Sequence, residues 1–223
     1  MDIKDLHNKF LECNSIVDID SRSIRNGSIF FGIKGDNFDG NEYAKSAIDK
    51  GASFAVIDNQ TYCLNKKYIL VDDVLSCLQE LSQYHRKQLN CPVLGITGTN
   101  GKTTTKELIK AVIQKNFKTV ATKGNLNNHI GVPLTLLSAK LDTEFLIIEM
   151  GANHINEINF LCKLAQVNFG IITNIGKAHL EGFGNIQNVV KAKKELYDHI
   201  NINNGTLFVN ANDKLLMLSL IHI

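Results

Sequence analysis

The feature that most constrains this chain is a glycine-rich turn between a buried strand and a helix, GITGTNGKTTTKELI at Gly95–Ile109. The continuous apolar run Val93–Thr97 is typical of a buried parallel strand, and strand, turn and helix follow one another directly. Gly98 and Gly101 allow the backbone to turn tightly, so that its N–H groups face inward and form a site for an anion. The N-terminus of the following helix adds partial positive charge. The segment therefore predicts a phosphate-binding loop.

Two side chains give this loop its chemistry. Lys102 provides a mobile positive charge for terminal phosphates, and Thr103 provides a hydroxyl that can bind Mg²⁺. The strict GxxxxGK[ST] pattern is not met, because Ile96 occupies its first glycine position and Gly95 lies one residue too early. This departure weakens an assignment to GTPases or kinases. The alternative interpretation is an ordinary glycine turn with a solvated lysine, but strand, glycines, Lys-Thr and helix all coincide here.

The pattern of apolar runs predicts an α/β protein with two domains. Residues 1–90 contain three strand candidates, SIFFGI, SFAVID and YILVDD, separated by helical segments, and predict a small α/β domain. In this part Asn41 is expected to be the N-cap, and Gly51 the C′ residue, of one helix. Residues 91–217 alternate strands such as KTVAT, EFLIIEM and FGIITNI with helices. This alternation indicates a P-loop-type, doubly wound and mostly parallel sheet, with ligands at the carboxyl ends of its strands.

The helix that follows the glycine-rich turn is predicted to start at Lys102 and to end near residue 116. Its apolar side chains recur four residues apart, which is typical of an amphipathic helix. The two pairs are Leu108 with Val112 and Ile109 with Ile113.

Composition excludes several classes of function. The chain has 223 residues with 24 Lys+Arg against 22 Asp+Glu, a net charge of +2, which offers no electrostatic footprint for nucleic acid or an anionic membrane. The sequence contains no apolar run near the ~20 residues that a membrane span needs. Its five cysteines are scattered without a CxxC spacing, which indicates reduced thiols in a cytoplasmic protein rather than a disulfide framework or a zinc site. A monomer is expected.

The last six residues, LSLIHI at Leu218–Ile223, do not fit the pattern before them. The preceding GTLFVNANDKLLM predicts a strand and the start of a helix, which then has no room to finish. LSLIHI is also what a common transposon-end sequencing adapter encodes in one reading frame. We expect residues 218–223 to be a sequencing artefact on a gene fragment, which the source DNA downstream of Met217 would test.

Four stretches, in order along the chain, resemble the Mur ligase family, the ATP-dependent amide ligases of peptidoglycan precursor synthesis. They are TGTNGKTTT, TKGNLNNHIGVPLTLL, EMGANHINEI and TNIGKAHLEGFGN. The resemblance runs from about Asp20 to about Met217. It implies that residues 1–90 bind the UDP-linked substrate and that residues 91–217 form a central ATP-binding domain, which is truncated here. The residues it implies for ATP binding are Gly98, Thr99, Asn100, Gly101, Lys102, Thr103 and Thr104.

Within the family, the MGANH and EGFG stretches resemble the branch that joins D-alanyl-D-alanine to UDP-N-acetylmuramoyl-tripeptide. In that reaction ATP phosphorylates the terminal carboxylate of the tripeptide, and the amine of D-alanyl-D-alanine attacks the acyl phosphate. The crowded negative oxygens need cations, which Mg²⁺ and Lys102 supply. Two alternatives stay open: a family member that adds a different amino acid, and a non-catalytic module that binds UDP-muramoyl peptide and ATP. Because the family's C-terminal domain is missing from the chain, we expect the fragment to be inactive.

The resemblance also implies residues that contact the substrate. Ser21 and Arg22, in DSRSIRNGSIFFGIKGDNFDGNEY, match the positions that meet the uridine nucleotide. The family often has a histidine after Asp-Gly, where this chain has Asn41. We expect this difference to affect one surface contact.

Three asparagines lie in the loop after the KTVAT strand. Amide side chains both donate and accept hydrogen bonds, which suits a peptide or pyrophosphate ligand. Asparagine also tolerates left-handed backbone, so turn formation is an equal alternative. The residues are Asn125, Asn127 and Asn128.

Four residues are implied as magnesium ligands. Thr103 is one. Glu149 ends the apolar strand FLIIEM at the carboxyl edge of the predicted sheet, where a charge that closes a buried strand needs a partner. The resemblance adds His179 in GKAHLEG, and a carbamylated lysine that we assign to Lys193.

The assignment of Lys193 rests on the family's carbamylated lysine, which also makes it a catalytic residue beside Lys102. Carbamylation turns an ammonium into a carboxylate and requires a neutral amine, hence a lowered pKa. The neighbouring charges of Lys191 and Lys194 would lower it. Either of these two lysines could be the match instead, and without the family all three would be a solvated helix face.

Overall fold

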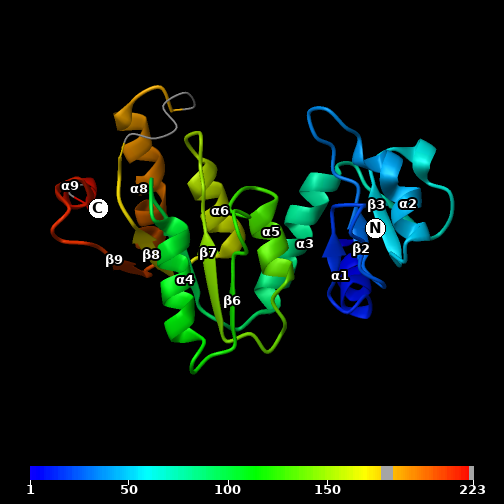
Figure 1. Cartoon of the computed structure of the whole chain (residues 1–223), viewed down its shortest axis with the longest axis horizontal. Coiled ribbons are helices and arrows are strands. Elements are labelled where there is room, and N and C mark those ends of the chain that lie inside the picture. Colours follow the sequence, from blue (N-terminus) through cyan, green and yellow to red (C-terminus); the bar gives the residue numbers. More distant parts are fainter. Residues whose placement is uncertain (177–182, 221–223) are drawn as a thin grey trace. The chain divides into compact units, whose positions relative to one another are not determined.

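The computed structural model describes residues 1–176 and 183–220. The chain divides into two compact units, Met1–Gln88 with Leu136–Lys140, and Leu89–Thr135 with Leu141–Ile223. Each unit contains a sheet of parallel strands with helices around it (Figure 1). The predicted α/β class is confirmed in both units.

The first unit has a four-stranded sheet in the order β1-β2-β3-β4. Phe30 of β2 belongs to an apolar cluster with Ala44 and Ala47 of α2. Because side chains alternate along a strand, Ile29 and Phe31 face the other side of the sheet, and both are buried. The elements of this unit are α1 (Ile3–Glu12), β1 (Val17–Asp18), β2 (Ile29–Phe31), η1 (Gly40–Tyr43), α2 (Ala44–Asp49), β3 (Phe54–Ile57), η2 (Gln60–Tyr62), β4 (Tyr68–Leu70) and α3 (Val74–Gln88).

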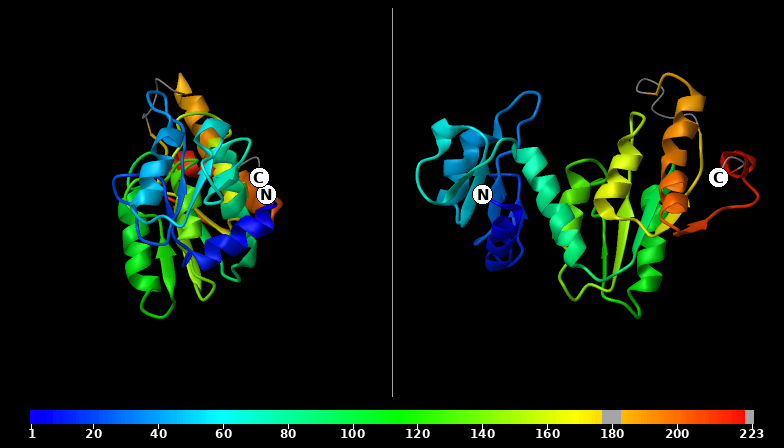
Figure 2. Two further views of the ribbon diagram at one scale, coloured as in Figure 1. Left: turned by 90° about the vertical axis from the view of Figure 1, so that its right-hand side faces the viewer. Right: turned by 180° about the vertical axis from the view of Figure 1, so that it is seen from behind.

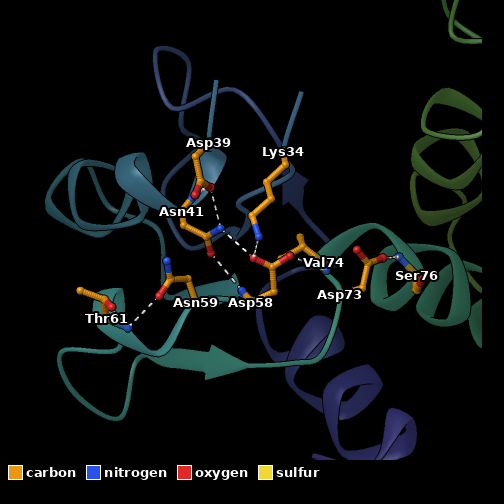
Figure 3. A network of polar contacts seen from close by, with 9 residues as sticks. All are labelled: Lys34, Asp39, Asn41, Asp58, Asn59, Thr61, Asp73, Val74 and Ser76. Atoms are coloured by element: carbon orange, nitrogen blue, oxygen red, sulfur yellow. Dashed lines mark hydrogen bonds and ion pairs between the residues drawn. The ribbon is translucent and has the colours of Figure 1, made fainter. Parts of the chain in front are cut away.

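A polar network at the carboxyl edge of this sheet surrounds Asn41 (Figure 3). The side-chain N–H groups of Asn41 donate to Asp39 at 2.6 Å and to Asp58 at 2.7 Å, and its carbonyl accepts the Asp58 N–H at 2.9 Å. Lys34 Nζ lies 2.8 Å from the same Asp58 carboxylate. Asn41 is fully buried, so the expected surface contact is wrong. Its side chain instead ties η1 to the end of β3.

The expected helix start at Asn41 is wrong for the same reason. The Asp39 side chain accepts the Asn41 N–H and caps the 3₁₀ helix η1, and α2 begins only at Ala44. The Asn41 side chain cannot serve as a cap, since its amide is committed to Asp39 and Asp58. Gly51 has a φ of +111°, a left-handed conformation suited to the residue after a helix end.

The second unit has a five-stranded parallel sheet in the order β6-β7-β5-β8-β9. Beginning at the central strand β5, the chain builds one edge through β6 and β7, then crosses to build the other edge through β8 and β9. The predicted doubly wound sheet is therefore confirmed, with its topological switch point beside β5. The elements are β5 (Val93–Thr97), α4 (Lys102–Ile113), β6 (Thr119–Ala121), α5 (Gly131–Leu137), β7 (Phe145–Glu149), α6 (Glu157–Ala165), β8 (Phe169–Ile172), α8 (Ile186–Ile202), β9 (Thr206–Phe208) and α9 (Lys214–Leu220).

Helices cover both faces of this sheet. Leu94 and Ile96 of β5 lie in an apolar cluster that α4 joins through Ile109 and Ile113. Gly95 faces the opposite side, where α6 and α8 contact each other and β5. Figures 1 and 2 agree, with α4 on the near side of the strands in Figure 1 and α6 and α8 on the near side in the right-hand view of Figure 2.

Gly95 is the residue that breaks the strict phosphate-loop spacing, and its neighbours explain why a glycine is needed there. A Cβ at this position would collide with Met150 and come within 2.9 Å of Val167 and 3.3 Å of Leu196 of α8. The glycine therefore leaves room against the central strand for Met150 and Val167, and for Leu196 of α8.

The helix α4 differs from its prediction in two respects. It ends at Ile113, three residues before the expected end. Of its two apolar pairs, Ile109 and Ile113 pack on the sheet, whereas Leu108 and Val112 are 65% and 71% exposed. Among the described residues, none of the helices combines the length and the apolar character needed to cross a bilayer.

Candidate active site

The candidate site of the second unit lies where four parallel strands end. The register pairs Ile96 of β5 with Glu149, and Thr97 with Ile172 of β8. The loops after β5, β6, β7 and β8 consequently leave the sheet at the same edge, beside the switch point. This is the position that a doubly wound sheet offers to ligands.

The glycine-rich loop connects β5 to α4 as predicted. Gly98 has a φ of +146° and Gly101 a φ of +75°, which are backbone conformations that favour glycine. Gly101 is the N-cap residue of α4, and among the described residues no side chain caps this helix end. The first N–H groups of a helix have no acceptor within it, so the start of α4 at Lys102–Thr104 offers donors and positive potential to an anion.

Lys102 folds back over this loop. Its Nζ donates to the carbonyls of Gly98 at 2.8 Å and Thr99 at 3.1 Å. Burial lowers the pKa of Lys102, and the negative charge of Glu149 opposes that shift. The ammonium therefore lies at the loop itself, within reach of anything bound at the start of α4.

Glu149 at the end of β7 meets the first turn of α4. Thr103 Oγ1 donates to Glu149 Oε2 at 2.9 Å, and the Asn127 amide donates to Oε1 at 2.9 Å. The Glu149 N–H donates to Thr122 Oγ1 at 3.0 Å, at the end of β6. Side chains two residues apart on a strand share a face, so Glu149 lies on the same face of the sheet as Ile147, which is the face that α4 covers. Glu149 is only 1% exposed. The structure thus brings together Thr103 and Glu149, two of the four predicted magnesium ligands.

Lys106 is a buried residue of this site that the sequence analysis missed. Its Nζ donates to the Thr122 carbonyl at 2.7 Å and lies 3.0 Å from Glu107 and 3.9 Å from Glu149. The residue is 0% exposed. Its spacing three residues after Thr103 could have revealed it, since this spacing places both side chains on one face of the helix.

A pocket of about 720 Å³ opens beside this cluster. Among the described residues, two lysines line it, Lys102 and Lys193. The N-terminal part of α6 and the preceding loop form one wall, and the loop after β6 forms another. The lining residues include Asn125, Asn127, Asn128, His129 and Asn153.

The three predicted asparagines play different parts in this wall. Asn128 Oδ1 accepts the N–H groups of Ile130 at 3.1 Å and Gly131 at 2.8 Å, which is turn chemistry at the start of α5. Asn127 holds Glu149, and its backbone carbonyl accepts the Gly151 N–H at 2.8 Å. Asn125 is exposed on the pocket wall.

Lys193 of α8 reaches the same pocket and is 3% exposed. Burial lowers its pKa to about 8, and the charge of Lys102 acts in the same direction. The expected cause, the charges of Lys191 and Lys194, is wrong: Lys191 is exposed and Lys194 pairs with Asp198 at 2.6 Å. Of the three candidate lysines, Lys193 is the one with a buried amine.

A second group of residues that the sequence analysis missed lies just after β8. Thr173 Oγ1 donates to the Asn100 carbonyl at 2.6 Å. The side-chain amide of Asn174 accepts the Asn100 N–H and donates to the Asn100 carbonyl. His179, the fourth predicted ligand, lies outside the described residues.

Ser21 and Arg22 line a separate pocket of about 480 Å³ in the first unit, with Phe38 and Tyr43. The Arg22 guanidinium pairs with Asp20 at 2.7 Å, and its hydrogen bonds lower the pKa of Asp20 to about 2. Arg22 is largely exposed, so this pair is open to competition by a bound anion.

Comparison with known protein families gives two adjacent matches. The model described as "Mur ligase middle domain" matches residues 96–221, and the model described as "Mur ligase family, catalytic domain" matches residues 15–96. The first covers the β5–α4 loop, Glu149 and Lys193, and the second covers Ser21 and Arg22.

Relatives with curated names point the same way. A UDP-N-acetylmuramoyl-tripeptide–D-alanyl-D-alanine ligase of Haemophilus influenzae is 39% identical over 199 residues, and one of Bacillus subtilis is 36% identical over 199 residues. These alignments cover 87% and 88% of this chain. The chain spans 43% of the length of each of these two relatives.

Solved structures show the same similarity in three dimensions. MurF from Acinetobacter baumannii superimposes with a TM-score of 0.82 at 32% identity, over 91% of this chain and 45% of that one. MurF ligase from Thermotoga maritima, in complex with ADP, gives a TM-score of 0.75 at 31% identity, over 82% of this chain and 43% of that one. By its sequence matches, its fold and the residues at the carboxyl edge of its second sheet, this chain belongs to the Mur ligase family.

Proposed function

We propose that the protein containing this chain is a cytoplasmic ligase that uses ATP to join D-alanyl-D-alanine to a UDP-N-acetylmuramoyl tripeptide. The observation that carries the proposal is the 2.9 Å hydrogen bond between Thr103 and Glu149, next to the uncapped start of α4 and to Lys102. The names of the curated relatives support the choice of substrates.

The phosphates of ATP would bind at Gly98–Thr104. The N–H groups at the start of α4 would hold phosphate oxygens. The Lys102 ammonium would give up its hydrogen bonds to two loop carbonyls and donate to the terminal phosphates instead. Both acceptors that it now uses are neutral carbonyls, so a phosphate anion is a stronger partner for the ammonium.

The residues present fit Mg²⁺. This ion prefers oxygen ligands and keeps several waters, and the Thr103 hydroxyl and Glu149 carboxylate offer two oxygens that already lie 2.9 Å apart. These two residues, with His179 and Lys193 as further candidates, would hold the metal. When bound, Mg²⁺ supplies positive charge that stabilises the oxygens of the transferring phosphoryl group.

The remaining residues would bind and orient the substrates. The pocket beside Lys102 would take the acceptor end of the tripeptide, with Asn125 as a contact. Lys193 would act there in its carbamylated form, for which a pKa lowered to about 8 provides the neutral amine. Ser21 and Arg22 would contact the UDP end in the first unit.

An assay of ATP-dependent phosphate release tests the proposal. Full-length protein with the tripeptide substrate should release phosphate with D-alanyl-D-alanine, and not with other amines or dipeptides. The Lys102→Ala variant should lose this activity, whereas Lys118→Ala, which breaks an exposed ion pair with Asp142, should retain it. Preference for another amine would favour a different ligase of the family.

The 223-residue chain alone is expected to behave differently. Since it spans 43% of the length of the curated relatives, we propose that it binds nucleotide and UDP-muramoyl peptide without turnover. Substantial phosphate release by this chain would contradict that expectation. Absence of release by the full-length protein with every amine, together with retained binding, would favour the non-catalytic module.

A further inference from the structure

The phosphate loop is held from outside by the four residues that follow β8, which we call the clamp segment, residues 173–176. The Thr99 N–H donates to the Asn174 carbonyl at 3.0 Å, and the Gly176 N–H donates to Thr99 Oγ1 at 2.9 Å. Thr173 Oγ1 donates to the Asn100 carbonyl at 2.6 Å. Both residues at the tip of the loop are thus bonded to a segment more than 70 positions away in the sequence.

Asn174 makes the most specific of these contacts. Its Oδ1 accepts the Asn100 N–H at 3.0 Å, and its Nδ2 donates to the Asn100 carbonyl at 3.0 Å. One amide group therefore satisfies both the N–H donor and the carbonyl acceptor of a single residue, as a neighbouring strand would. Of the side chains, only an amide offers a donor and an acceptor in this planar arrangement.

The clamp segment also determines which loop donors face a ligand. The N–H groups of Thr99 and Asn100 are used by Asn174 and so do not face an anion, whereas the first turn of α4 has N–H groups without an acceptor inside the helix. A Cβ on Gly98 would collide with Thr173, so glycine at this position lets the two segments approach. The clamp segment therefore shapes one side of the loop.

We propose that Thr173 and Asn174 are positioning residues that hold the phosphate loop in its nucleotide-binding shape before the nucleotide arrives. This inference rests on the proposed binding of ATP at Gly98–Thr104. A loop that must be ordered on binding loses conformational entropy at that moment, which weakens affinity. Fixing the Asn100 peptide in advance removes part of that loss. Neither residue needs to touch the nucleotide for this effect.

Three variants of the chain separate this role from a general loss of stability. Asn174→Ala removes both bonds to Asn100, Thr173→Val removes one hydroxyl at nearly constant volume, and Thr173→Ser retains the hydroxyl. Asn203→Ala is the matched control, because the side-chain amide of Asn203 donates to the His199 carbonyl of its own helix end, and the residue is exposed on the same unit.

Two measurements are made on each variant. Residue-resolved amide exchange should be about tenfold faster at Asn100 in Asn174→Ala, from the loss of its acceptor, with little change in β5. Titration with Mg²⁺-ADP should give about tenfold weaker binding for Asn174→Ala and several-fold weaker binding for Thr173→Val. Thr173→Ser and Asn203→Ala should match the unchanged chain, and the thermal midpoints should stay close together.

The outcomes separate this inference from the proposed function. Nucleotide affinity that is unchanged in Asn174→Ala and Thr173→Val, in a chain that binds Mg²⁺-ADP, would overturn the positioning role alone. If the unchanged chain and full-length protein both fail to bind the nucleotide, the proposed function and this inference fall together. Weaker binding that follows a lowered thermal midpoint in every variant, including Thr173→Ser, would mark the clamp segment as a structural support only.

Discussion

Replacement of Lys106 by methionine tests how much the buried positive charge beside Glu149 contributes to the stability of the second unit. The ammonium of Lys106 is fully buried and lies 3.9 Å from the Glu149 carboxylate, whose side chain is 2% exposed. Methionine retains the unbranched apolar stem and removes the charge and the donor to Thr122. Glu149 is left as a buried carboxylate without the ammonium that lies 3.9 Å from it. We therefore expect the second unit to lose stability.

The size of this loss follows from the contacts that remain. Breaking a buried ion pair by removing one partner typically costs about 3–5 kcal/mol. Thr103 and Asn127 still donate to Glu149 in the variant, each at 2.9 Å, so the lower end of this range applies. A loss of about 3 kcal/mol corresponds to a fall in the thermal midpoint on the order of 10 °C, and in the urea midpoint of about 1–2 M.

The assay is urea unfolding, followed by circular dichroism and by amide exchange in β5, which reports the second unit itself. Lys118→Met is the matched control, because Lys118 pairs with Asp142 at 2.8 Å with both side chains more than 60% exposed. A surface pair of this kind contributes about 0–1 kcal/mol. The control should therefore unfold close to the unchanged chain.

A double variant decides whether the charge on Glu149 is the cause. In Lys106→Met with Glu149→Gln, no unpaired charge is buried, so the double variant should be no less stable than Lys106→Met alone. The reasoning is refuted if Lys106→Met loses less than about 1 kcal/mol, or if the two substitutions destabilise additively.

Three further predictions concern groups outside the loop. Burial lowers the pKa of His7 and His85, whose ring nitrogens lie 3.0 Å apart, so below pH about 6.5 the unfolded chain binds more protons than the folded one. The stability of the first unit should therefore fall as the pH drops from 7.5 to 5.5, and a flat series of urea midpoints would contradict this. Tyr197→Phe should be neutral or stabilising by up to about 1 kcal/mol in thermal unfolding, because among the described residues the buried hydroxyl has no hydrogen-bond partner. Glu195→Ala should cost about 1–2 kcal/mol in urea unfolding, since this carboxylate accepts the Asn156 N–H at 2.6 Å at the start of α6; an unchanged midpoint would argue against that cap.

The sequence was sufficient to predict those parts of the fold that follow from local pattern. The run Val93–Thr97 and the glycines after it predicted β5 and the start of α4, because a buried parallel strand and a tight turn have strong local signatures. The position of Glu149 at a sheet edge followed in the same way. The residues that surround Glu149 could not be predicted from local pattern. Lys106 and Thr122 come together because of the strand order of the folded sheet.

The errors have a common physical cause, which is tertiary contact overriding local preference. Asparagine is a residue type that often caps a helix, but the side-chain amide of Asn41 donates to Asp58, 17 residues later in the sequence. Leu108 and Val112 have helical spacing like that of Ile109, but spacing alone does not say which of two adjacent stripes faces the sheet. For Lys193, nearby lysines in the sequence suggested repulsion, whereas burial in the folded protein is the larger effect.

The strand order of the second unit has a consequence for synthesis of the chain. The site needs the ends of β5, β6, β7 and β8, and β5 pairs with both β7 and β8. While the polypeptide emerges from the ribosome, the glycine-rich segment appears early but lacks both flanking strands. Pairings between such distant segments form slowly. A nascent chain that ends before Phe169 lacks β8 and would therefore expose an unpaired edge of its central strand β5. A chaperone that covers this edge would act during that interval.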